Sequence, residues 1–77
     1  MFLNGDGVGN DESFLGLAES RDICYDWVIT QEPNANGVTY GKLGGGRDKE
    51  CYAEFGMINV NVRDPRWQAC LFEGKYF

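Results

Sequence analysis

Histidine is absent from this chain of 77 residues, which also holds only two prolines and three cysteines. Imidazole is the commonest general base and the commonest metal ligand in proteins, so its absence points away from catalysis. Three widely spaced cysteines cannot easily supply the four ligands of a zinc site. We therefore expect no catalytic residue, no metal and no cofactor.

Basic residues are also scarce, since seven lysines and arginines face twelve aspartates and glutamates, for a net charge of −5. The imbalance lies in residues 1–40, where Arg21 alone opposes seven acidic residues. An acidic protein repels phosphate backbones, and the bases spread over the second half of the chain form no dense patch. Nucleic acid is therefore not an expected partner.

A long hydrophobic run is missing, and no stretch approaches the roughly 20 apolar residues of a membrane span. The first six residues have neither the basic nor the apolar region of a signal peptide. The cysteine usage nevertheless fits an oxidising compartment better than the cytosol. We therefore expect a secreted, extracellular protein whose leader has been removed.

The chain does contain enough apolar material to fold, with 43% apolar and 14% aromatic residues despite eleven glycines. A chain of this length forms one domain, so residues 1–77 are expected to be a single unit. In so small a domain, one disulfide contributes about 3 kcal/mol by restricting the unfolded chain.

The clearest predicted helix begins after Ser20, whose hydroxyl can cap the first turn, and ends near Gln31, just before Glu32 and Pro33. Apolar residues at helical spacing form one stripe along it, namely Ile23, Cys24, Trp27 and Val28. Three of the remaining segments, by contrast, alternate with a period of two, which is typical of strands.

Residues 4–12 are rich in glycine and acidic residues and predict an irregular loop, and Asn36-Gly37 predicts a tight turn. Strands are expected over residues 38–40, 51–55, 58–62 and 67–72. One helix followed by antiparallel strands predicts an α+β domain, in which one α-helix packs on a small antiparallel β-sheet stapled by a disulfide.

Cys24 lies on the apolar stripe of the helix, and Cys51 lies on the apolar face of its strand. A helix packed on a sheet could bring their β-carbons within the about 4 Å that a disulfide requires. Cys70 alternates with Ala69 and Leu71 and is expected to point away from the core. We predict a Cys24–Cys51 bridge, with Cys70 as a reduced or intermolecular thiol. A Cys51–Cys70 bridge and three reduced thiols are the alternatives.

The segments Ser-Arg-Asp-Ile-Cys, Pro-Asn-Ala-Asn-Gly-Val-Thr-Tyr and Glu-Cys-Tyr-Ala-Glu, within residues 20–55, resemble the PAN/apple superfamily. In that family a helix cysteine is bridged to a cysteine of a central strand. The chain has fewer cysteines than many members, because its glycine-rich stretch at residues 5–9 holds none to pair with Cys70. The resemblance implies an extracellular adhesion module that binds carbohydrate or protein without catalysis.

Aromatic and basic residues outside the predicted core are candidate ligand contacts. Tyr52 and Phe72 fall opposite the predicted core faces, where they suit sugar-ring stacking or a protein interface. Four bases on two predicted loops could form a cationic cluster that holds a sulfate or carboxylate of a glycan. These four bases are Arg47, Lys49, Arg63 and Arg66.

Acidic residues are expected to be solvated. Residues 4–12 are dense in oxygen ligands but do not follow the EF-hand spacing, so a solvated loop is favoured over a calcium site. The pair Glu50 and Glu54 could share a proton, but nothing in the sequence places it in a pocket, and solvated charge is favoured here too.

These observations predict a secreted, non-catalytic recognition or adhesion module that binds a glycan or an extracellular protein. The alternative is a structural subunit that self-assembles into dimers or filaments. Its contacts would then be an aromatic strand edge ending at Tyr76 and Phe77, together with Cys70.

Overall fold

The computed structural model describes residues 2–42, 44 and 46–72, which form one helix and seven strands. In chain order the elements are β1 (Leu3–Asn4), β2 (Asp6–Val8), β3 (Asp11–Leu17), α1 (Arg21–Gln31), β4 (Gly37–Gly41), β5 (Glu50–Phe55), β6 (Asn59–Asn61) and β7 (Trp67–Leu71).

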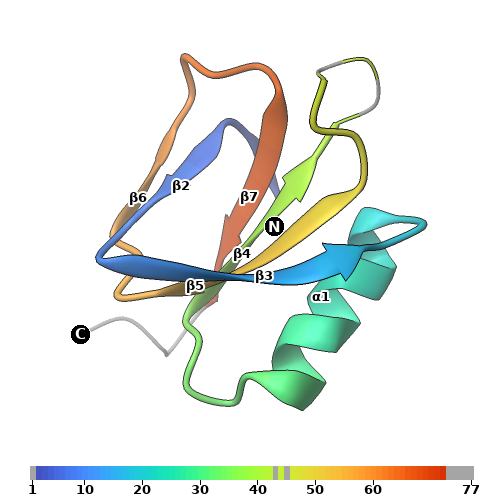
Figure 1. Ribbon diagram of the computed structural model, residues 1–77. Helices are drawn as coiled ribbons and strands as arrows, with labels where there is room; N and C mark the ends of the chain where they lie inside the picture. The colour runs from blue at the N-terminus through green and yellow to red at the C-terminus, as the bar shows by residue number, and fades with distance from the viewer. Residues whose placement is uncertain (1, 43, 45, 73–77) are drawn as a thin grey trace.

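The strands form two separate antiparallel sheets. Five of them follow the order β1-β7-β4-β5-β3, while β2 and β6 pair with each other as a two-stranded ribbon, called here the β2–β6 ribbon. Figure 1 shows α1 on one side of the five-stranded sheet and the β2–β6 ribbon on the other. The predicted α+β class is confirmed, but the sheet is larger than expected.

The helix begins where the sequence predicts, because the Ser20 hydroxyl accepts a hydrogen bond from the backbone N–H of Ile23 at 3.2 Å. Cys24 and Val28 are fully buried against the sheet, and Trp27 is half-buried. Ile23 is exposed, so the apolar stripe is narrower than predicted.

The predicted loop at residues 4–12 is wrong, because these residues form β1, β2 and the start of β3. Their pairing partners are far along the chain: β2 pairs with β6, and β1 pairs with β7. Gly5 (φ +148°) lets the backbone pass from one sheet to the other against the main chain of Asn61, where a side chain has no room. Local composition carries no signal of such long-range pairing.

The predicted tight turn at Asn36-Gly37 is also wrong, since Gly37 starts the buried strand β4. The Asn36 side-chain amide donates to Met57 O at 2.9 Å, and its oxygen accepts from Met57 N–H at 2.8 Å. Asn36 thus binds both backbone groups of Met57 as a neighbouring strand would. A β-carbon at Gly37 would meet the Met57 sulfur and lie 3.0 Å from the Cys70 carbonyl oxygen, so the Met57 side chain would have to move.

Both faces of the five-stranded sheet are buried, but unequally. The main core lies between α1 and the sheet and contains Ala18, Cys24, Val28, Ala35, Val38, Tyr40, Cys51, Ala53, Cys70 and Phe72. A smaller cluster lies under the β2–β6 ribbon and contains Met57, Val60 and Ala69, with Leu71 packed against it. The sheet is therefore the middle layer of the fold.

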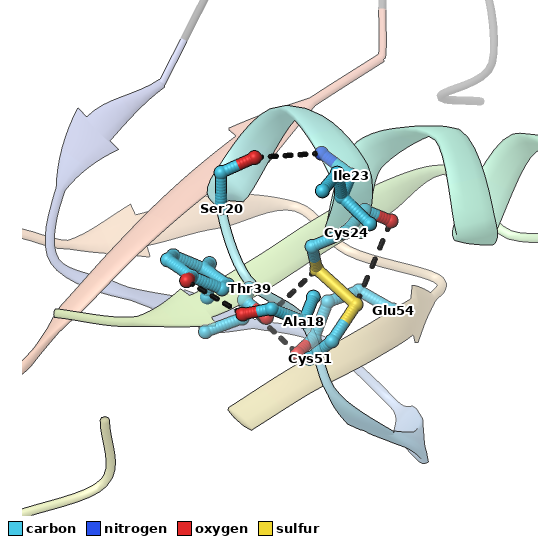
Figure 2. The surroundings of a disulfide bond; sticks show 8 residues. Ala18, Ser20, Ile23, Cys24, Thr39, Cys51 and Glu54 are labelled. Carbon is cyan, nitrogen blue, oxygen red and sulfur yellow. Dashed lines mark hydrogen bonds between the residues drawn. A yellow bond between two sulfur atoms is a disulfide. The ribbon is translucent and has the colours of Figure 1, made fainter. Parts of the chain in front are cut away.

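The Cys24–Cys51 disulfide is confirmed, with its two Cα atoms 5.5 Å apart. It joins the first turn of α1 to β5 inside the main core, as Figure 2 shows. Cys70 lies outside this bridge and is only 4% exposed. The expectation that Cys70 points away from the core is wrong, because its face of β7 is the one that α1 covers.

Phe72 is also buried, at 6% exposure, in the main core, so the expectation of an exposed ring there is wrong.

Within the described part of the chain, no helix has the length and apolar character needed to cross a membrane.

Candidate functional site

Glu54 of β5 lies on the sheet face opposite α1 and is only 2% exposed. The prediction that its carboxyl is solvated is wrong. The Thr39 hydroxyl of the neighbouring strand β4 donates to Glu54 Oε2 at 2.8 Å. A carboxyl that is buried and hydrogen-bonded to a neighbouring strand marks this face as a candidate functional site.

The alternation of the strands explains why Thr39 and Glu54 meet. In the antiparallel β4–β5 pair, Thr39 lies opposite Tyr52 and Gly37 lies opposite Glu54, so these side chains share one face. Gly7 of β2 then covers them. A β-carbon on Gly7 would lie 2.6 Å from Thr39 Oγ1 and 3.2 Å from Glu54 Cδ. Only glycine allows the ribbon to approach this closely.

Two further carboxyls converge on Glu54. Glu12 of β3 lies directly opposite Glu54 in the β3–β5 pair, and Asp6 comes from β2. Burial raises the pKa of Glu54 to about 8, helped by the charge of Glu12, a hydrogen bond with Glu12 and the charge of Asp6, while the hydrogen bond from Thr39 opposes this shift. Burial, and then the charges of Glu12 and Asp64, also raise the pKa of Asp6.

At neutral pH the Glu54 carboxyl is therefore mostly protonated. It accepts from Thr39 through one oxygen, and its proton allows it to donate a hydrogen bond to the Glu12 carboxylate.

A cavity of about 140 Å³ opens beside these groups, and we call it the acidic cavity. Its walls are Asp6, Glu12, Thr39, Arg47, Tyr52 and Trp67. A second, more open hollow of about 250 Å³ is also lined by Glu12, and it reaches Glu54. Glu12 is thus shared by the two hollows, and each contains at least one further acidic residue.

An aromatic row runs across this face beside the acidic cavity. The rings of Tyr52 and Trp67 are 5.7 Å apart and nearly perpendicular, and those of Phe14 and Tyr52 are 5.3 Å apart. The Tyr52 hydroxyl donates to Glu50 Oε1 at 2.7 Å. Burial and this bond raise the pKa of Tyr52 to about 12, so its hydroxyl stays protonated. Phe14 ends the row and is 55% exposed.

The four predicted basic residues lie in different settings. Arg47 lines the acidic cavity and forms a 3.5 Å ion pair with Glu50. Lys49 pairs instead with Glu19 at 3.2 Å, beside another cavity of about 430 Å³ at the start of α1. Their loop does meet the turn before β7, because the Lys42 N–H donates to the Arg66 carbonyl at 2.9 Å.

The turn before β7 carries the other two bases. Arg66 binds Asp64 through two guanidinium contacts, at 3.0 and 2.9 Å, and this hydrogen bonding lowers the pKa of Asp64. Arg63 is exposed. Three of the four bases are thus each paired with a nearby carboxylate, and the ion pairs of the described residues do not join all four into one anion site.

Among residues 2–42, 44 and 46–72, no set of three or more carboxylates or thiols has the arrangement of a metal site. Comparison of the chain with protein-family models, curated proteins and solved structures found no match. The site is therefore interpreted from its own geometry.

Sequence reasoning identified two of the cavity residues, Tyr52 and Arg47, and the structure brings them together. It missed four others: Asp6, Glu12, Thr39 and Trp67. A signal for part of the site was present, because Tyr52 and Glu54 are two residues apart on one strand and must share a face. The burial of that face by residues 6–8 had no counterpart in the local sequence.

Proposed function

We propose that this protein is a non-catalytic extracellular recognition module that binds a glycan in the acidic cavity and along the aromatic row. The single observation that carries the proposal is the joining of both features on one face. Tyr52 and Trp67 belong to the row and also form walls of the cavity. Aromatic faces with a few convergent polar groups are typical of ligand sites.

The chemistry of the walls favours a neutral glycan. Sugar hydroxyls are donors, and the carboxylates of Glu12 and Asp6 and the Thr39 oxygen are acceptors. Arg47 adds a donor that is held by Glu50. The carboxylates would repel sulfated or otherwise anionic glycans. The proposed ligand therefore differs from the anionic glycan that the predicted cluster of bases would bind.

Two further arguments support the extracellular part of the proposal. The Cys24–Cys51 disulfide is typical of proteins from oxidising compartments. The resemblance of residues 20–55 to the PAN/apple superfamily implies the same location and a binding role.

An array of neutral and sulfated oligosaccharides, probed with the intact protein, tests this proposal. We expect neutral ligands to bind and Phe14→Ala to weaken binding about 5- to 10-fold, because its exposed ring would be lost from the aromatic row. Leu17→Ala is the matched control, since Leu17 lies on the same strand and is 63% exposed but is not part of the row. A silent array, or equal loss in both variants, would refute the proposal.

A second candidate function is self-assembly through β3. This strand is one edge of the five-stranded sheet, and it exposes Phe14 and Leu17. Cys70 is buried and does not lie at this edge, while Tyr76 and Phe77 lie outside the described residues. Light scattering after size exclusion tests the idea: a dimer that Leu17→Lys converts to monomer would support it, and a wild-type monomer at high concentration would exclude it.

A further inference from the structure

The β2–β6 ribbon packs on the five-stranded sheet through strands β4 and β7, and Glu54 lies beneath it. Strands β2 and β6 pair over only three residues each. The Gly5 N–H donates to Trp67 O at 2.8 Å where the ribbon leaves the sheet, and the Asn10 N–H donates to Phe55 O at 3.2 Å where it returns. Between these two points, Gly7 lies on the side chains of Thr39 and Glu54.

Two carboxyls from neighbouring strands act on Glu54, and Asp11 of β3 lines the hollow that reaches it. Asp6 comes from β2 and Glu12 from β3, while β4 contributes the uncharged Thr39. The strand β6 contributes no charged residue, and Trp67 of β7 is uncharged. Farther out, the groups facing this cluster are Asp64 and Arg66, which act on Asp6, together with Arg47 and Tyr52 in the cavity wall.

We propose that Glu54 is a pH-sensitive latch, which holds the β2–β6 ribbon against the five-stranded sheet while protonated and releases it when ionised. This inference goes beyond the proposed function and does not depend on it. It rests on the position of one buried carboxyl at the interface between two sheets.

The protonated form fits the closed state. Glu54 is then neutral beneath the ribbon, accepts from Thr39, and has a proton to share with Glu12. Ionisation would place a third negative charge beside Glu12 and Asp6, with the backbone of Gly7 packed close to the Glu54 side chain. Lifting the ribbon would widen the hollow that reaches Glu54 and so hydrate that charge more fully.

The ribbon strands contain no cysteine, so no disulfide ties the ribbon to the sheet. The helix on the opposite face is tied to β5 by the Cys24–Cys51 disulfide, whereas the ribbon is held by the small cluster of Met57, Val60 and Ala69. With a pKa of Glu54 of about 8 in the closed state and an ordinary value of 4.5 once hydrated, opening is favoured as pH rises. Linkage gives an increase of about 10- to 100-fold in the opening equilibrium between about pH 6 and 9.

Amide hydrogen exchange measured on the intact protein, expressed as protection factors at each pH, tests the latch. The reporters for the ribbon are the N–H groups of Gly5 and Ile58, which donate to Trp67 O and Val8 O. The reporter for the sheet is the N–H of Phe72, which donates to Asn36 O. We expect the ribbon protection factors to fall about 10- to 100-fold from about pH 6 to 9, and that of Phe72 to stay constant.

Glu54→Gln is the decisive variant, because the amide keeps the shape and a donor but cannot ionise. We expect its ribbon protection to be independent of pH. Glu19→Gln is the matched control, because Glu19 lies away from the ribbon in an exposed ion pair with Lys49, and the wild-type loss should persist. Equal loss in Glu54→Gln, or loss at Phe72 together with the ribbon, would overturn the proposal.

A measurement without any variant covers the case in which Glu54→Gln does not fold. The side-chain carboxyl of Glu54 is followed by ¹³C NMR in the wild-type protein. Titration with a midpoint near 8, in step with the exchange of the Gly5 and Ile58 amides, supports the latch. A carboxyl that titrates with the exposed glutamates overturns it.

Discussion

Strands β4, β5 and β7 send alternate side chains to two faces of one sheet, and the two faces are covered in different ways. On the helix face, an apolar cluster surrounds a disulfide that fixes α1 to β5. On the ribbon face, two short strands cover a hydrogen-bonded carboxyl and leave the acidic cavity beside it. Stability is concentrated on one face, so the other can hold buried acidic groups that a core could not tolerate.

Removal of the disulfide is expected to have the largest effect on stability, because the bridge fixes α1 to the sheet. In a Cys24→Ala/Cys51→Ala variant we expect a loss of about 3 to 4 kcal/mol in the free energy of unfolding, from a bridge across a sequence separation of 27. Urea denaturation measures it. Cys70→Ala is the control; it deletes a buried sulfur outside the bridge and should cost about 1 kcal/mol. Equal losses of unfolding free energy in the two variants would show that the disulfide is not the main source of stability on the helix face.

A second test asks whether the ribbon face imposes a pH dependence on the whole domain. The pKa of Glu54 is raised in the folded state, to about 8 from an ordinary 4.5, so the folded protein binds a proton that the unfolded chain releases. Its stabilising contribution is therefore full below about pH 4.5 and is lost as pH rises through about 8.

The free energy of unfolding should accordingly decline by at most about 1.4 kcal/mol per pH unit within that window, for a total of about 2 to 4 kcal/mol. Urea melts at successive pH values measure the decline. Glu54→Gln should flatten this curve. A slope shared by wild type and variant would assign the pH dependence to other groups.

Gly7→Ala tests the closeness of the ribbon to the sheet. A methyl group there would lie 2.6 Å from Thr39 Oγ1, so the ribbon must shift outward. We expect a loss of about 1 to 3 kcal/mol in stability and faster exchange of ribbon amides already at neutral pH. Val8→Ala removes an exposed side chain from the same strand and should change stability by less than about 1 kcal/mol. Unchanged ribbon exchange in Gly7→Ala would contradict the close packing.

The helix face was more predictable from sequence than the ribbon face, and the reason is physical. Capping by Ser20 and the spacing of Cys24 and Val28 are local signals, so the helix and the disulfide could be predicted. The ribbon is built from residues paired across more than fifty positions, such as Asp6 with Asn61. Glycine and aspartate in β2 have low strand propensity, and their conformation is set by these distant partners.

The same difference explains the errors at single residues. Alternation correctly placed Cys70 and Leu71 on opposite faces of β7, but the sequence did not show that both faces are covered. The prediction of a solvated Glu54 is wrong because nothing in the local sequence places this residue in a pocket, and its partner Thr39 lies on another strand. In the candidate site, Tyr52 and Arg47 could be predicted as ligand contacts from their residue types. The positions of Asp6 and Glu12 beside them could be seen only in the folded structure.

Loss of the helix cap is the mildest change, and it tests whether the two faces of the sheet behave independently. Ser20→Ala removes the hydroxyl that accepts from Ile23 N–H, and we expect a loss of about 1 kcal/mol in the free energy of unfolding. Because Ser20 is not in contact with the ribbon, the variant should keep the wild-type pH dependence of exchange at Gly5 and Ile58. Ser20→Asp, which restores a capping acceptor, should recover most of the stability. If instead Ser20→Ala shifted the pH at which the ribbon opens, the two faces would be coupled through the sheet, and the division of the molecule into a stapled face and a titratable face would fail.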